Sequence, residues 1–326
     1  QKIGLREPLY LEAAEFAGID LKQATHLANL ETFDAPDLGT KLAAFTTEAP
    51  KTVADQTQTP LLTVAGLQFA YPKGRQIFTD LNLTLHHGEM VALVGRNGVG
   101  KSTLSHLIAG FLNPNAGQIT LDGEDLATWS VKERADKIGY ILQDPNQMIS
   151  KHLIFDEVAL GPRLRGWDED RVKSAVLSAL KVCGLYPFRS WPINALSYGQ
   201  KKRVTIAAIL VLEPALMILD EPTAGQDWRH FTDMMRFLTK LNDQGITMML
   251  ITHDMHLMLE YAQRAIVLGD GGVLMDATPA AVLTNPDVIQ HASLAQPSLY
   301  RLAKRLNLDP LAFTQAVIDQ ERRVRQ

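Results

Sequence analysis

Apolar positions recur along this chain with two different periods, and the two kinds of segment alternate. Strand-like segments, with period-two patterning or a short apolar run ending at Gly or Asp, occupy residues 61–71, 77–85, 90–95, 117–123, 138–143, 216–220, 247–252 and 265–270. Helical spacing is clearest in residues 101–112, 155–166 and 168–185. This alternation predicts an α/β fold with a parallel sheet, and the mainly helical stretch 146–203 predicts a lobe inserted into it.

The two ends of the chain lie outside this alternation. Residues 22–60 are rich in Thr, Ala, Asp and Pro and show no sustained periodicity, which predicts a linker. We therefore expect one α/β domain over residues 61–284 and a helical tail of mixed charge over residues 285–326.

Composition narrows the class of protein. The 326 residues are 46% hydrophobic and 21% charged, as in ordinary globular proteins, and they are enough for a sizeable core. A net charge of −4 argues against a surface for nucleic acid. The single cysteine, Cys183, rules out an intrachain disulfide and is expected to be packed and inert. The longest apolar stretch is broken by Glu213 and Pro214, so we expect any membrane contact to go through a partner.

The first chemical motif is GRNGVGKST, Gly95 to Thr103, which follows a predicted strand and opens a predicted helix. It fits the phosphate-binding pattern G-x-x-x-x-G-K-[ST], in which glycines let the backbone wrap around phosphate. Lys101 supplies a cation for the β- and γ-phosphates, and Ser102 a hydroxyl for Mg²⁺. The alternative is a glycine-rich turn with a solvated lysine, which the strand–loop–helix context disfavours. Kinases and GTPases carry the same motif. The residues of the loop that we expect to bind the nucleotide are Gly95, Asn97, Gly98, Gly100, Lys101, Ser102 and Thr103.

A pair of acids follows a later strand. The segment LMILDEP ends an apolar run in Asp220 and Glu221, at the edge where ligands bind in open α/β sheets. We expect Asp220 to hold Mg²⁺ through water and Glu221 to orient and deprotonate the attacking water. The alternative is a strand end that is merely capped by surface acids.

The segment LSYGQKKRV, Leu196 to Val204, discriminates between nucleotide-binding families. It resembles the signature Leu-Ser-Gly-Gly-Gln of the nucleotide-binding subunit of ATP-binding-cassette (ABC) transporters; the matching residues are Ser197, Gly199 and Gln200, and Tyr198 replaces a glycine. The resemblance implies that this loop, at a helix N-terminus, grips the γ-phosphate of ATP bound to an opposite cassette. The basic side chains of QKKR are expected to form a solvated helix face.

Further residues follow the family's order between residues 61 and 284. The resemblance implies that Tyr71 stacks on adenine, Gln143 touches Mg²⁺ and water, and His253 contacts the γ-phosphate. Asp227, in AGQD, matches the loop that crosses the dimer interface. The alternatives are a core tyrosine and a surface histidine. The resemblance also implies the fold: a P-loop cassette with a parallel-sheet core, an antiparallel β subdomain and the inserted helical lobe. It implies a transport-coupled ATPase that uses ATP and Mg²⁺.

Two parts of the sequence indicate which subgroup of ABC transporters the chain resembles. The segment QDPNQMISKHLIFDEVALGPRLRG resembles the energy-coupling-factor importers of vitamins and metals, with one residue fewer in its first part and Leu160 in place of Phe. LSYGQKKRV and EPTAGQDWRHF are similar to the tandem cassettes of hydroxymethylpyrimidine or thiamine importers. The resemblance implies a transmembrane coupling subunit, a substrate-binding membrane protein and a peripheral place on the cytoplasmic membrane face. We expect the segment 143–165 to dock the membrane partner through Ile154, Phe155, Val158, Leu160, Arg163 and Arg165.

One phrase occurs near both ends of the chain. Arg6–Leu21 and Gln296–Pro310 each contain a Pro, then Leu-Tyr, then a short helical pattern that closes on Ile-Asp or Leu-Asp. Because repetition signals duplicated units and the first residue is Gln1, we expect residues 1–21 to be the tail of a preceding cassette in a tandem protein. The alternative is a chance similarity of two amphipathic helices. The second cassette of the ATP site is then either this preceding one or another copy of the chain.

Two other classes are weighed against an importer. Soluble ABC proteins of ribosomes join their cassettes by long charged helical linkers, and those of DNA repair carry long coiled-coil or zinc insertions. The Thr- and Ala-rich linker and the uninterrupted cassette of this chain match neither pattern. An exporter cassette is the remaining alternative, and Tyr198 in the signature disfavours it.

Overall fold

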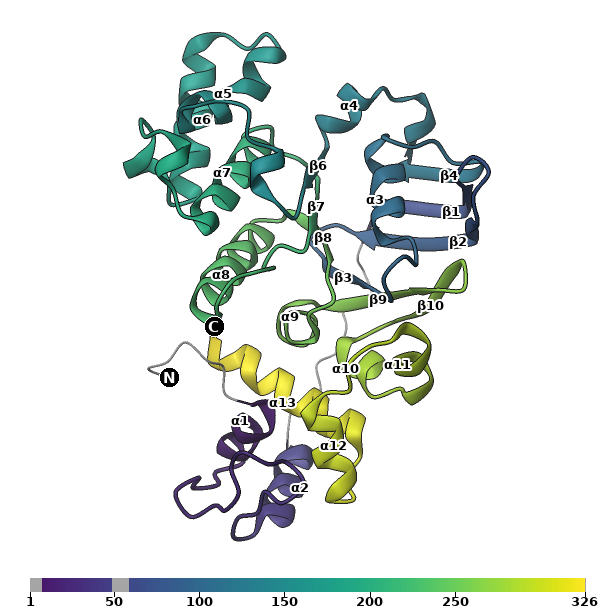
Figure 1. Cartoon of the computed structure of the whole chain (residues 1–326), viewed down its shortest axis with the longest axis vertical. Coiled ribbons are helices and arrows are strands. Elements are labelled where there is room, and N and C mark those ends of the chain that lie inside the picture. Colours follow the sequence, from purple (N-terminus) through teal and green to yellow (C-terminus); the bar gives the residue numbers. More distant parts are fainter. Residues whose placement is uncertain (1–7, 49–58, 326) are drawn as a thin grey trace.

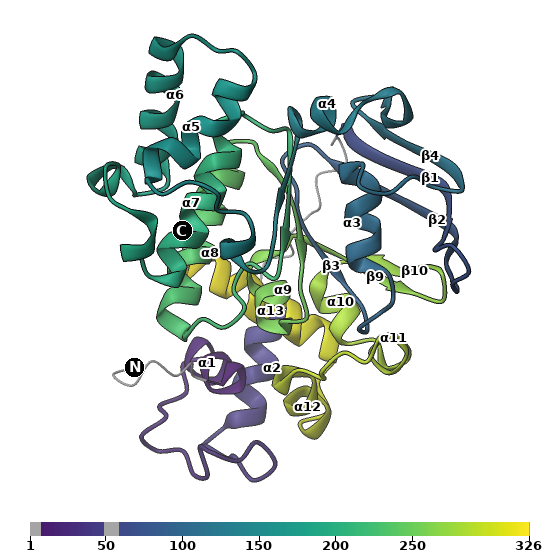
Figure 2. The same cartoon turned by 45° about the horizontal axis from the view of Figure 1, so that its top comes forward.

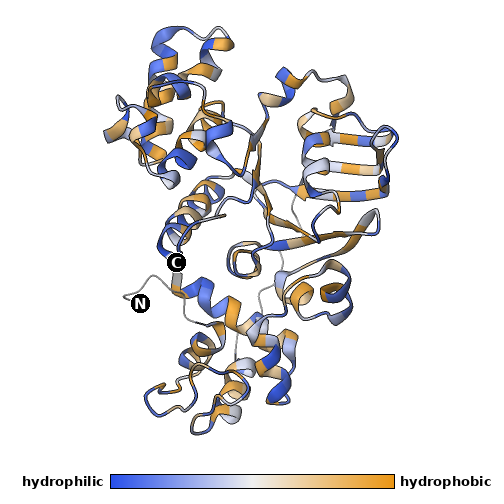
Figure 3. Ribbon diagram, viewed as in Figure 1, coloured by the Kyte–Doolittle hydropathy of each residue, from blue (hydrophilic) through white to orange (hydrophobic). Residues whose placement is uncertain are grey.

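A six-stranded sheet forms the centre of the molecule (Figure 1). In the computed structural model, which describes residues 8–48 and 59–325, the strand order is β10-β9-β3-β8-β7-β6. The strands are β3 Met90–Val94, β6 Ile138–Ile141, β7 Leu216–Asp220, β8 Thr247–Ile251, β9 Arg264–Gly269 and β10 Gly272–Ala277. β10 pairs antiparallel with β9, and the other neighbours pair in parallel. The parallel strands are hydrophobic (Figure 3) because both of their faces are buried. The predicted α/β class and parallel sheet are confirmed.

A second sheet, antiparallel throughout, covers one side of the core. Its order is β2-β1-β4-β5, with β1 Pro60–Ala70, β2 Gln76–His86, β4 Ala116–Leu121 and β5 Glu124–Asp125. Helix α3, Lys101–Ala109, lies between the two sheets (Figure 2), where Leu104, Leu107 and Ile108 are fully buried. The 3₁₀ turn η1 Leu126–Thr128 and α4 Val131–Ala135 lead back to the core sheet.

The predicted helical lobe is inserted between β6 and β7. It contains η2 Pro145–Gln147, α5 Ile154–Leu164, α6 Glu169–Val182, η3 Tyr186–Phe188, η4 Ile193–Ala195 and α7 Tyr198–Leu210. Asp168 caps α6 by accepting the Arg171 N–H at 2.9 Å, which explains why this helix begins where it does. Ile154 and Val158 are fully buried inside the lobe, so the expectation that they dock a partner is wrong for these two residues.

Helices close the remaining faces of the core and form the tail. α8 Trp228–Asp243 joins the cluster of the lobe, and α9 Met255–Tyr261 and α10 Pro279–Leu283 pack beside β9. α11 Pro286–Ala292, α12 Ser298–Arg305 and α13 Pro310–Arg325 follow, as the predicted helical tail. Within the described parts of the chain, no helix has both the length and the apolar character needed to cross a membrane.

The N-terminal residues fold onto this tail. α1 Leu9–Phe16 and α2 Leu38–Glu48 share one buried cluster with α12 and α13, into which Phe33 and Leu42 insert. The expectation of a linker over residues 22–60 therefore does not hold for residues 22–48, and residues 49–58 lie outside the described parts. The apolar residues of this segment have no periodicity because they fit a surface supplied by helices that are distant in sequence.

The repeated phrase forms the same local structure twice. Each helix starts after a proline, Pro8 for α1 and Pro297 for α12. Each also has a residue with positive φ two positions after its last helical residue, Gly18 at 70° and Asn307 at 57°. The two helices contact each other in the buried cluster that they share with α2 and α13. Residues 1–7 of the expected preceding tail lie outside the described parts, and the origin of the phrase stays a prediction.

Candidate functional site

The loop between β3 and α3 has the backbone that its glycines were expected to allow. Gly95, Gly98 and Gly100 have φ of 144°, 77° and 116°. A Cβ on Gly95 would lie 2.6 Å from the Leu268 carbonyl oxygen, and one on Gly100 would lie 2.7 Å from Phe78 Cζ. Glycine is therefore required at Gly95 and Gly100 by both the dihedral angle and the space, and at Gly98 by the dihedral angle alone. Asn97 and Gly98 also line a hollow of about 310 Å³ beside the loop.

Lys101 closes the loop and begins α3. Its ammonium donates hydrogen bonds to the carbonyls of Gly95 at 2.7 Å and Arg96 at 3.2 Å. Burial lowers the pKa of Lys101, while Glu221 and Asp220 act in the opposite direction. No side chain caps the start of α3, so its first N–H groups remain available for an anion.

The neighbours of Lys101 include the expected Mg²⁺ and adenine residues. Ser102 has an exposed side chain on the first turn of α3. The adjacent Thr103 is buried, and its hydroxyl lies 3.2 Å from the Tyr71 hydroxyl. Tyr71 is 41% exposed and contacts Phe69 edge to face, so its ring is accessible beside the loop. The alternative of a fully buried core tyrosine is excluded.

The two acids stand together at the end of one strand, as expected. Asp220 is the last residue of β7, and Glu221 follows it with φ of 44°, which is rare for a residue with a side chain. Burial, and then the charge of Glu221, raise the pKa of Asp220, while Lys202 and Lys101 lower it. Glu221 is fixed through its backbone as well, because its N–H donates to Ile251 O at 2.9 Å.

His253 and Thr252, which follow β8, orient the Glu221 carboxylate. His253 Nδ1 lies 2.6 Å from Glu221 Oε1, and Thr252 Oγ1 donates to Oε2 at 3.3 Å. The Glu221 side chain is only 14% exposed, whereas the imidazole is 74% exposed. One carboxylate is thus held in place while the histidine presents a free edge to a ligand.

The signature residues form a helix start. Ser197 caps α7: its hydroxyl accepts the Gln200 N–H at 3.3 Å, and Gln200 Oε1 accepts the Ser197 N–H at 2.9 Å. Gly199 lies in the first turn, with only His230 within 4.0 Å of a Cβ there. The Tyr198 hydroxyl donates to the Gln143 carbonyl at 3.0 Å.

The structure brings most of these residues together, but not all. Strand β6 ends at Ile141, so Gln143 lies in the following loop rather than at a strand end as expected. Asp227 caps α8 by accepting the His230 N–H at 2.9 Å. Between residues 59 and 325, no hydrogen bond or ion pair joins residues 197–200 to the phosphate loop, and α7 and α3 lie on different sides of the core sheet (Figures 1 and 2).

Lys202 was missed by the sequence reasoning. It was expected on a solvated face, yet it is 1% exposed, and burial lowers its pKa to about 8 against the attraction of Asp220, Asp144 and Glu221. The run QKKR concealed it, because a run of charges usually marks a solvated surface. The usable signal was its spacing of four residues from Tyr198, which places both side chains on one helix face.

The fold and the site define a P-loop nucleotide-binding domain of the ATP-binding-cassette type. The family model described as ABC transporter matches residues 78–224, and a second, described as ATP-binding cassette cobalt transporter, matches residues 1–69. A solved structure of cbiO1 from Clostridium perfringens, part of the ABC transporter complex cbiONQ, is 33% identical with a TM-score of 0.67 and covers 75% of this chain and 99% of that chain. This chain belongs to the ABC transporter family, and its cassette is an ATPase domain of that family.

Curated relatives agree with this assignment. A protein of Lactiplantibacillus plantarum, described as an ABC transporter ATP-binding protein, is 60% identical over 99% of this chain and 57% of its own length. One of Enterococcus faecalis with the same description is 52% identical over 99% of this chain and 57% of its own length. The chain thus spans little more than half the length of these curated relatives.

Proposed function

We propose that this chain binds and hydrolyses ATP with Mg²⁺ to energise a membrane importer of a vitamin, a vitamin precursor or a metal ion. The proposed hydrolysis rests on the position of the Glu221 carboxylate. His253 and Thr252 hold it at the end of β7, beside Asp220. The importer rests on the match of residues 1–69 to a cobalt-transporter family and on the similarity to cbiO1. Hydroxymethylpyrimidine or thiamine is the substrate that the signature segment suggests.

The residues present fit a magnesium ion. Ser102, Gln143 and Asp220 offer a hydroxyl, an amide and a carboxylate, the oxygen ligands that Mg²⁺ prefers. A bound Mg²⁺ would neutralise charge on the phosphates. The pKa of Asp220 is raised because its carboxylate is poorly solvated and lies near the negative charge of Glu221. A divalent cation is favourable beside two such acids.

Each remaining group has one task in this proposal. The loop N–H groups and the Lys101 ammonium hold the β- and γ-phosphates, and Tyr71 stacks on the adenine. The carboxylate of Glu221 accepts the proton of the attacking water, and His253 holds that carboxylate through Nδ1. Catalysis is then positioning and charge stabilisation.

A second cassette completes the site in this proposal. Ser197 and Gly199 are not bonded to the phosphate loop of their own chain, so we place them on the γ-phosphate of ATP held by an opposing cassette, which Asp227 contacts across the interface. That cassette is a preceding one in the same polypeptide or another copy of this chain. A peripheral position on the cytoplasmic face of the membrane follows from the coupling to a transmembrane subunit and a substrate-binding membrane protein.

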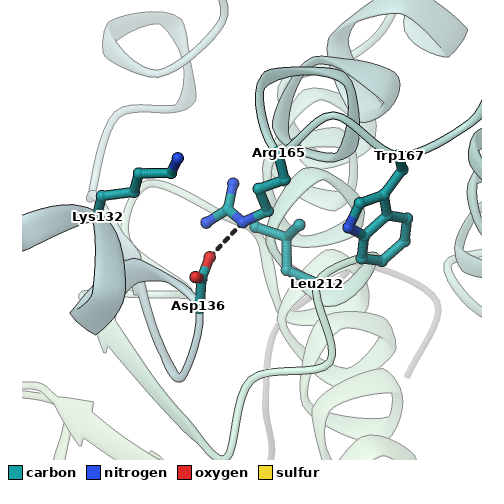
Figure 4. A pocket seen from close by; sticks show the side chains of 5 residues that line it. All are labelled: Lys132, Asp136, Arg165, Trp167 and Leu212. Atoms are coloured by element: carbon teal, nitrogen blue, oxygen red, sulfur yellow. Dashed lines mark hydrogen bonds and ion pairs between the residues drawn. The ribbon is translucent and has the colours of Figure 1, made fainter.

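The docking surface is proposed along the exposed side of α5. Leu164 is 70% exposed, Arg163 is exposed, and Phe155 is partly buried. At the end of this helix a hollow of about 370 Å³ opens between the core and the lobe (Figure 4). Arg165 points across it and pairs with Asp136, and the rest of its lining is Lys132, Trp167 and Leu212. Exposed apolar and basic groups beside a hollow suit a partner helix.

Replacing Glu221 tests the proposed hydrolysis. Glu221→Gln keeps the shape of the side chain but removes the base, so we expect kcat for ATP to fall by about 100-fold or more while ATP binding is kept. The matched control is Glu124→Gln on the exposed strand β5. Steady-state ATPase assays and nucleotide binding measured on the same preparations decide it. Activity of Glu221→Gln close to that of the parent protein excludes Glu221 as the base.

A further inference from the structure

We propose that Lys202 is a positioning residue that ties the loop after β6 to the signature helix α7. This inference rests on the proposed function. In this proposal the buried ammonium of Lys202 fixes the main chain of Gln143 relative to Ser197. Gln143 is the residue expected beside Mg²⁺, and Ser197 is the residue expected on the opposite ATP.

Three hydrogen bonds from one helix reach two consecutive carbonyls. Lys202 Nζ donates to Leu142 O at 2.8 Å and to Gln143 O at 2.7 Å. The Tyr198 hydroxyl donates to Gln143 O at 3.0 Å. Because Tyr198 and Lys202 are one helical turn apart, both donors come from the same face of α7. We call these four residues the Lys202 clamp.

The chemistry of the contact shows that it is not an ordinary ion pair. Lys202 is 1% exposed, and in the described parts of the chain it pairs with carbonyl oxygens and with no carboxylate. A buried ammonium is costly to desolvate, and its N–H groups need acceptors. The acids Asp220 and Glu221 at the end of β7 and Asp144 in the loop act on it through space and favour its charged form. A smaller apolar side chain would leave both carbonyls without their charged donor.

The clamp gives Tyr198 a specific task as well. The family signature has glycine at this position, and glycine has no hydroxyl to donate. Here Tyr198 lies immediately after Ser197, so the signature turn itself is bonded to the loop of Gln143. A displacement of Gln143 toward the ATP of its own site would therefore move Ser197 relative to the ATP of the other site. The clamp makes these two parts one rigid unit.

Lys202→Met tests the clamp, with Lys201→Met as the matched control. Lys201 is the adjacent lysine, only partly buried, and its ammonium lies 3.2 Å from Asn146 Oδ1. For Lys202→Met we expect kcat to fall about 10-fold or more with KM for ATP changed by less than about 2-fold, because the phosphate loop is untouched. Amide hydrogen exchange in residues 142–148 should become about 10-fold faster, with exchange in α6 unchanged. Lys201→Met should match the parent protein in both measurements.

Lys202→Arg separates positioning from a purely structural role, because arginine keeps a charged donor at the same place in α7. We expect Lys202→Arg to restore kcat and the exchange rate of residues 142–148 toward the values of the parent, whereas Lys202→Met loses both. Values of kcat and exchange in Lys202→Met equal to the parent, or a Lys202→Arg protein no better than Lys202→Met, would overturn the clamp. A parent without ATPase activity would contradict the proposed function, and the exchange measurement would still decide the clamp.

Discussion

Glu221 shows how one residue of this site combines backbone and side-chain constraints. Its φ of 44° turns the chain sharply after β7, and its N–H is bonded to the end of β8. The sequence indicates that an acid pair ends this strand, because the apolar run stops there. It does not indicate that His253 and Thr252 fix the carboxylate, since that depends on the pairing of two strands.

Cys183 carries a prediction at the same scale. It is fully buried at the end of α6, and burial raises the pKa of its thiol to about 12. Because the thiolate is the reactive form, a raised pKa lowers the reactive fraction of Cys183, to about one part in 10⁴ at pH 8. We expect a thiol-alkylating reagent at pH 8 to leave the folded protein unmodified and to label the unfolded protein fully, as measured by mass spectrometry. Equal labelling rates in both states would contradict the burial of this residue.

At the scale of elements, the strands and the phosphate loop were the most predictable parts. A fully buried parallel strand is continuously apolar, and the glycine and lysine spacing of the loop has one dominant meaning. Strand β10 was not predicted, because its residues are only partly buried and lack a clear period. Lys202 was not predicted either, because its partners are backbone carbonyls, which every sequence has.

Helix α5 carries the prediction for the docking surface. Leu164→Asp places a charge on a side chain that is 70% exposed, so the fold should tolerate it. Phe155→Asp tests the partly buried neighbour. We expect both to release the protein from membranes that contain its transmembrane partner while ATP affinity is kept. The matched control is Val324→Asp on α13, which is 67% exposed.

Co-purification with the transmembrane subunit measures this release. A Leu164→Asp protein that binds ATP normally and still co-purifies as well as the parent would place the docking surface elsewhere. Loss of binding in Val324→Asp as well would show that the effect is not specific to α5.

The whole molecule shows where sequence patterns are least informative. Residues 22–48 look like a linker, yet Phe33 is 1% exposed and Leu42 is fully buried against helices from the other end of the chain. Such packing leaves no local period, because the partner surface lies more than two hundred residues away. In contrast, the cassette itself was predictable, since the phosphate loop, the acid pair and His253 each follow a strand and the motifs occur in a fixed order.

The most direct test of the composite ATP site is the specific ATPase activity of the chain across a wide dilution series. Two chains must meet to join Lys101 and Glu221 of one to Ser197 of the other, so activity per molecule should rise with protein concentration. Ser197→Arg should lower it at every concentration, because a bulky charged side chain replaces the hydroxyl at the helix start. Light scattering on the same samples reports the oligomeric state. A high activity that is independent of concentration, in a chain shown to be monomeric, would contradict the account.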